Sequence, residues 1–195
     1  MDISASQWAV LIVILLVACA VAAWGYRARR DQSQRLRQRF GPEYARAVDR
    51  LGGRAKAEAE LRAREKRVEK LNIVPLSAAD AGRFNQSWNA LQGRFIDNPK
   101  GVVVEADHLV YELMARRGYP MGDFERRAAD ISVDHPGVVA NYRSARAIAL
   151  RDERGEADTE ELRRAVVHYR ALFDELLRTP SLTESGALAD RRVSA

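Results

Sequence analysis

The chain of 195 residues has one cysteine, Cys19, and three histidines. A single cysteine excludes a disulfide within the chain and a zinc site built from several thiolates. The histidines, at positions 108, 135 and 168, are nowhere four residues apart, the spacing by which two histidines on one helix bind zinc. We therefore expect no cofactor and no metal site.

Motifs of catalysis and nucleotide binding are absent as well. There is no phosphate-binding loop with its lysine, no glycine-rich dinucleotide turn, no nucleophile elbow and no zinc-protease helix. The alternation of apolar and polar residues that marks a strand is also missing. The sequence favours an all-α protein and offers no support for catalysis.

A long apolar run without charge is present at residues 8–26. A helix of this length measures about 28 Å, close to the ~30 Å thickness of the hydrocarbon layer of a bilayer. Trp8 at one end, and Trp24 with Tyr26 at the other, suit the two headgroup layers. We expect a transmembrane helix over 8–26, preceded by a short external tail at residues 1–7.

An arginine collar follows the apolar run at once. Its six arginines and Asp31 sum to +5, the formal net charge of the whole chain, so the excess charge is local. Because basic residues beside a first span stay in the cytoplasm, we expect the N-terminus outside and the C-terminal domain cytoplasmic at a bacterial cell membrane. The collar suits anionic headgroups or serves only as this topology signal, and no aromatic residue interleaves it as nucleic-acid binding would require. Its members are Arg27, Arg29, Arg30, Arg35, Arg37 and Arg39.

Two alternatives concern the apolar run. Ala20-Val21-Ala22 resembles a signal-peptide cleavage site, and Leu16 to Cys19 resembles a bacterial lipobox in which Cys19 would carry lipid. The absence of basic residues before the run, and its continuation past Cys19, argue against both. Either alternative would make this a cleaved or lipidated protein of the cell envelope.

Residues 27–75 are expected to form a basic juxtamembrane helix and a charged helical stalk. Gly41-Pro42 interrupts the first helix, Pro42 starts another, and Gly52-Gly53 ends it. Residues 54–71 are rich in Ala, Glu, Arg and Lys, with pairs such as Glu60/Arg64 at i,i+4 and few apolar positions. This composition predicts a solvated helix.

Amphipathic helices predict a soluble bundle over residues 76–178. Their start signals are Ser77 with Asp80, Asn98 before Pro99, Asp123, Asp134 before Pro136, and Asp158 with Glu161. The helix that begins at Asp123 is expected to end near Ala129. Residues 179–195 are small and polar without periodicity, and we expect them to be disordered.

A polar cluster in the expected turn between two of these helices has two interpretations. Its members are Asp130, Ser132, Asp134 and His135. Carboxylates, a hydroxyl and an imidazole could serve acid–base chemistry or hold a cation, which would make the protein an enzyme or a metal or ligand sensor. Helix capping by Ser132 or Asp134 is the favoured interpretation.

Tyr119, Met121 and Phe124 lie in an expected loop. They could form a docking surface for a protein partner, or the loop could fold over the bundle core.

Several sequence words between residues 36 and 177 resemble a family of uncharacterised bacterial membrane-anchored or "secreted" hypothetical proteins. The words are Arg39 to Tyr44, Ala57 to Leu61, Arg94 to Asp97, Arg117 to Pro120, Asp130 to Pro136 and His168 to Phe173. The resemblance implies a bacterial setting and no assigned activity. The leading expectation is a non-enzymatic, membrane-tethered helical module that binds an unidentified protein, with anionic lipids as further partners.

Overall fold

The computed structural model describes residues 5–178, without the side chains of residues 5–14, Leu16, Ala18, Ala22, Ala28 and Arg29. The elements of this part of the chain are all helices, joined by turns and loops, and it contains no strand, which confirms the all-α prediction. The tail expected to be disordered, 179–195, and residues 1–4 of the external tail lie outside the described residues. The helices are α1 (Ala5–Phe40), α2 (Pro42–Leu51), α3 (Arg54–Val68), α4 (Ala78–Gly93), α5 (Pro99–Arg116), α6 (Phe124–Asp134), α7 (Pro136–Glu153) and α8 (Thr159–Arg178).

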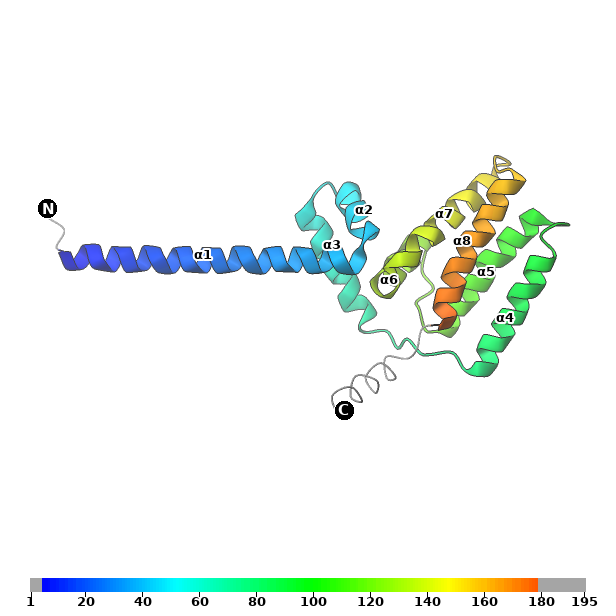
Figure 1. Ribbon diagram of the computed structural model, residues 1–195, viewed down its shortest axis with the longest axis horizontal. Helices are drawn as coiled ribbons and strands as arrows, with labels where there is room; N and C mark the ends of the chain where they lie inside the picture. The colour runs from blue at the N-terminus through cyan, green and yellow to red at the C-terminus, as the bar shows by residue number, and fades with distance from the viewer. Residues whose placement is uncertain (1–4, 179–195) are drawn as a thin grey trace, which may run out of the picture.

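Helix α1 contains both the expected span and the arginine collar without a break. Figure 1 shows it as a long rod that projects from the other helices and meets them only at its C-terminal end. None of the helices, as far as the structure describes them, is both long and apolar enough to cross a membrane. Much of the expected span, including the Trp8 side chain, lies outside the described side chains, so the transmembrane helix stays a prediction.

Local capping signals place most helix starts. The Ser77 hydroxyl accepts a hydrogen bond from the Asp80 amide at the start of α4, and the Asn98 side chain accepts one from the Gly101 amide at α5. Asp158 and Glu161 bond each other's backbone amides before α8, as a capping box does. These predictions, and the start of α2 at Pro42, are confirmed.

Helix α6 is longer than expected. Asp123 caps it as predicted, but it continues beyond Ala129 to Asp134. The β-branched and polar residues 130–134 favour a turn by propensity, and tertiary contacts overcome that weak preference. Ile131 and Val133 are both buried in this last stretch, which keeps it helical.

Two hydrophobic cores meet at α6. The larger one joins α4 to α8 and includes the rings of Trp88 and Phe173, which are tilted by 33° with their centres 4.7 Å apart. The smaller one joins the end of α1 with α2 and α3, and Val133 of α6 completes it. Ile131 belongs to the larger core, so α6 contributes side chains to both.

The expectation of a solvated stalk or surface helix over residues 54–71 is corrected in part, because α3 is a surface helix with one buried face. Ala57 and Leu61 of α3 are fully buried in the smaller core, and the Arg64 side chain is 1% exposed. Figure 1 shows α3 crossing the end of α1, with α2 beside both. The composition suggested a solvated helix because its apolar residues are few. A few small apolar residues nevertheless suffice for a buried face when the neighbouring helices pack closely and the polar side chains find partners.

Candidate functional site

The polar cluster of residues 130–135 begins with Asp130, which is fully buried in α6. Its Oδ1 atom accepts a hydrogen bond from Nε of Arg67 in α3 at 2.7 Å, and Nη2 of the same arginine forms an ion pair with this oxygen, also at 2.7 Å. Buried carboxylates require such a partner, since an isolated buried charge is strongly unfavourable. Asp130 therefore connects α6 to α3.

Ser132 makes a second connection between the same two helices. Its hydroxyl donates to the carbonyl oxygen of Ala129 at 2.6 Å and accepts from Nη1 of Arg64 at 3.3 Å. Burial lowers the pKa of Arg64, although Glu60 raises it through a hydrogen bond. The Ser132 hydroxyl thus both donates and accepts a hydrogen bond inside the protein.

Glu43 of α2 extends this network to α7. Arg64 Nη1 lies 3.6 Å from Glu43 Oε2, and Arg143 of α7 donates to both Glu43 oxygens at 3.0 and 3.3 Å. Arg143 also donates to Glu125 of α6 at 2.8 Å. We call Glu43, Arg64, Arg67, Asp130 and Arg143 the ionic junction, because together they join α2 and α3 to α6 and α7.

Capping by Ser132 or Asp134 is not observed, which corrects the favoured interpretation of this cluster. Helix α7 begins after His135 without a side-chain cap. Asp134 is exposed, whereas Nδ1 of the buried His135 lies 3.2 Å from Glu175 of α8. The polar cluster is therefore divided: Asp130 and Ser132 bind arginines of α3, Asp134 is exposed to solvent, and His135 contacts Glu175 of α8.

A cation site from these residues also finds no geometric basis. No three His, Cys, Asp or Glu side chains lie together as metal ligands anywhere in the described part of the chain.

Comparison with protein-family models, with curated proteins and with solved structures finds no match.

The arginine collar is divided between solvent and the fold. Arg27, Arg30 and Arg35 are exposed on α1, and the Arg29 side chain lies outside the described ones. Arg39 instead pairs with Glu65 of α3 at 3.1 Å and donates to the Val133 carbonyl at 3.4 Å. Of the residues expected to contact headgroups, Arg39 is thus a structural residue.

The expected interfacial anchors Trp24 and Tyr26 project from α1. Their side chains are 75% and 69% exposed, respectively. At a membrane interface, both rings would lie at the level of the lipid headgroups.

The loop between α5 and α6 packs against the bundle. Tyr119 is buried, and burial strongly raises the pKa of its hydroxyl. Met121 and Phe124 are half-buried against the larger core, where the Phe124 ring lies 4.7 Å from that of Tyr142. Tyr119 is thus a core residue, and Met121 and Phe124 pack against the core, as the interpretation of a loop folded over the bundle expects; the alternative of a free docking surface is corrected.

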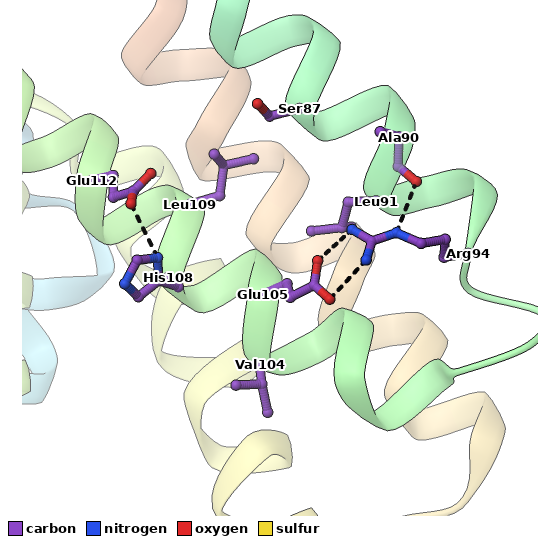
Figure 2. A pocket seen from close by; sticks show the side chains of 9 residues that line it. All are labelled: Ser87, Ala90, Leu91, Arg94, Val104, Glu105, His108, Leu109 and Glu112. Carbon is purple, nitrogen blue, oxygen red and sulfur yellow. Dashed lines mark hydrogen bonds and ion pairs between the residues drawn. The ribbon is translucent and has the colours of Figure 1, made fainter.

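An open groove of about 500 Å³ lies between α4 and α5 (Figure 2). Its charged side chains pair within the groove: Arg94 with Glu105, and His108 with Glu112 at 3.3 Å. Leu91 and Leu109 supply much of its floor. The groove therefore presents no unpaired charge that would select a charged ligand.

Sequence reasoning missed the buried polar residues of the ionic junction. Glu60/Arg64 carried a weak signal, since their i,i+4 ion pair was expected and forms at 3.3 Å. Nothing local distinguishes Arg64 from its half-buried neighbour Arg62, because the partners Glu43 and Ser132 are distant in sequence.

Proposed function

We propose that this chain is a single-pass membrane protein that holds its helical bundle at the cytoplasmic face as a non-enzymatic interaction or scaffold module. One observation carries the proposal: α1, which contains the apolar run, ends inside the folded part. Leu36 and Phe40 are 2% and 0% exposed, and Arg39 binds α3 and α6. The anchor and the bundle are thus parts of one structure.

The geometry supports a fixed spacing from the membrane. Leu36 follows Tyr26 by ten residues, which correspond to about 15 Å of helix. A bundle mounted in this way meets other membrane proteins at a high local concentration, because tethering replaces free diffusion. An unidentified protein is the partner that we propose, with anionic lipids near the collar.

The engagement of the polar cluster supports a non-enzymatic role. Asp130 and Ser132 are bound by arginines of α3, and His135 lies against Glu175. A catalytic acid, base or nucleophile has to reach a substrate. These side chains instead face other helices, where they contribute to the packing of the fold.

Single-cysteine labelling tests the membrane topology. In a Cys19→Ala background, Ser4→Cys and Ile96→Cys place thiols on opposite sides of the expected span; Ile96 is 91% exposed. An impermeant maleimide should label Ser4→Cys in intact spheroplasts and Ile96→Cys only after lysis. The unaltered chain is the control, since Cys19 inside a bilayer should react only in detergent.

Labelling of Ile96→Cys in intact spheroplasts would overturn the cytoplasmic placement. The intact mass of the membrane-extracted chain distinguishes the reasons. A loss of about the first twenty residues would indicate cleavage, and added acyl mass on a chain that begins at Cys19 would indicate a lipoprotein. An uncleaved mass agrees with the proposal.

A further inference from the structure

A second hollow, of about 540 Å³, lies where α1 passes the start of α3. Five residues of one α1 face line it, because positions four, seven, eight and eleven after Tyr26 follow the helical repeat. Arg54, the first residue of α3, closes the other side. The α1 residues are Tyr26, Arg30, Ser33, Gln34 and Arg37.

The hollow concentrates positive charge. Across the described residues, no carboxylate forms an ion pair with Arg30, Arg37 or Arg54, whereas Arg64, Arg143 and most arginines of the bundle are paired. Arg37 lies over the ring of Tyr44 instead, 5.1 Å from its centre. Guanidinium groups gathered without carboxylates favour the binding of an anion.

Two carboxylates lie near this charge, and in the described part of the chain neither forms an ion pair with Arg30, Arg37 or Arg54. Glu58 accepts hydrogen bonds from the hydroxyls of Ser33 and Tyr44 at 2.7 and 2.8 Å. Asp49 lines the adjoining hollow, which shares Arg37 and Arg54. Because the Ser33 hydrogen is engaged, the side-chain donors left in the hollow are the three guanidinium groups, the Gln34 amide and the Tyr26 hydroxyl.

The start of α3 adds to the positive potential. Gly53 precedes this helix without offering a side-chain cap, and its first turn has no acidic residue. The first amides of a helix lack partners within it, and the helix dipole makes this end positive. Phosphate groups bind favourably at such helix starts.

The Cα–Cβ bonds of Arg30 and Arg37 tilt toward the N-terminal, apolar part of α1, on the side of the expected membrane surface. Side chains on a helix tilt toward its N-terminus, and the apolar run is N-terminal to the collar. Arg30 and Arg37 follow Tyr26 by about 6 and 16 Å along the axis. When the Tyr26 ring lies in the headgroup layer, a phosphate group of that layer is within reach of the end of the hollow that Tyr26 lines.

We propose that the hollow bounded by Arg30, Arg37 and Arg54 is a binding site for a phosphate group, presented by the headgroup of an anionic lipid. The lipid source rests on the proposed membrane topology, whereas phosphate recognition by the three arginines does not. The site is more specific than general attraction to the collar, because it requires Arg54 of α3.

Native mass spectrometry of the full-length chain in neutral detergent tests the site. The probes are phosphatidic acid, phosphatidylcholine and inorganic pyrophosphate. We expect one phosphatidic acid to bind in preference to phosphatidylcholine. Arg54→Gln and Arg30→Gln should each weaken it about tenfold, as the loss of one charge-assisted hydrogen bond would do.

Two matched variants separate the site from diffuse electrostatics. Arg35→Gln removes the same charge from an exposed position of α1, and Lys56→Gln does so two residues after Arg54; neither side chain lines the hollow. Both should bind phosphatidic acid as the unaltered chain does. Equal weakening in all four variants, or equal binding of phosphatidylcholine, would overturn the site.

The measurement with pyrophosphate shows whether the bound phosphate group comes from a lipid headgroup or from a free phosphate compound. Pyrophosphate binding that depends on Arg54, without binding of phosphatidic acid, would support phosphate recognition and overturn the lipid source. Because binding in micelles does not depend on orientation in a membrane, a failed topology test would leave this result intact. Failure here with the expected maleimide pattern would remove only the phosphate site.

Discussion

At the scale of single residues, Gly118 has the most demanding backbone position. It follows α5 with φ at +90°, and a Cβ atom there would lie 2.4 Å from the carbonyl oxygen of Asn72. The segment from α3 to α4 passes this point and is held by a hydrogen bond from the Val74 amide to the Arg117 carbonyl, at 3.0 Å. Only glycine allows the chain to turn and the segment to approach so closely.

Gly118→Ala should lower the free energy of unfolding by about 1–3 kcal/mol from backbone strain, with a further loss from the contact with Asn72. Chemical denaturation measures this effect. Gly82→Ala is the matched control: Gly82 lies inside α4 with open space around it, and alanine there should stabilise by about 0.5–1 kcal/mol. Equal effects of the two substitutions would contradict this account of Gly118.

Arg117 also shows what a single residue contributes. It is buried, it donates to the carbonyl of Leu176 near the end of α8 at 2.6 Å, and burial lowers its pKa. A cation near the last carbonyls of a helix is favourable because that end carries partial negative charge. Arg117 thus links the turn after α5 to α8.

At the scale of elements, α4 is joined to α5 by a carboxylate with three donors. Asp80, in the first turn of α4, accepts hydrogen bonds from Arg116, Arg83 and Ser77. These bonds, Arg116 first, hold the pKa of Asp80 well below its ordinary range. The charged form is therefore favoured by folding.

Stability from Asp80 should be present above its unfolded pKa of about 4 and be lost as the pH falls below that value. Asp80→Asn should melt at a lower temperature than the unaltered chain at pH 7, and this difference should shrink between pH 4 and pH 2. Thermal melts at several pH values measure it. Asp97→Asn, at an exposed position after α4, is the control and should show no such difference. A difference for Asp80→Asn that is constant with pH would contradict the linkage.

Helix starts and helix ends differ in how far they follow from sequence. The starts at Ser77, Asn98 and Asp123 depend on side chains within three residues of the cap, and they were predicted. The end of α6 depends on hydrogen bonds from Arg64 and Arg67, which are more than 60 positions away in the sequence, and this end was not predicted. Local hydrogen bonds are encoded locally, whereas tertiary ones are not.

At the scale of the whole molecule, the ionic junction joins α2 and α3, which belong to the smaller core, to α6 and α7. Glu43 is its centre, since Arg64 and Arg143 approach it from α3 and α7. Removal of one partner of a buried ion pair leaves the other charge buried without compensation. The junction therefore stabilises one arrangement of the two cores.

Glu43→Ala should reduce the free energy of unfolding by up to about 3–5 kcal/mol, because the buried Arg64 and the half-buried Arg143 lose the carboxylate between them and keep only the more exposed Glu60 and Glu125 as partners. Hydrogen exchange should increase in α2 and α3 more than in α5 and α8, which belong to the larger core. Glu156→Ala is the control, since Glu156 pairs with Arg154 at the surface and its loss should matter little. A uniform increase of exchange in all helices would contradict a local role of the junction.

The sequence by itself determined the helical class, the capped starts of the helices, the apolar run and the collar beside it. Each of these depends on residues within one or two helical turns of each other. Only the tertiary structure decided that α3 is a packed helix, that Asp130 and Ser132 bind arginines, and that Arg54 lies beside Arg30 and Arg37. A charged side chain has the same local pattern in solvent as in a buried pair, and the fold alone determines whether its partner is water or another helix.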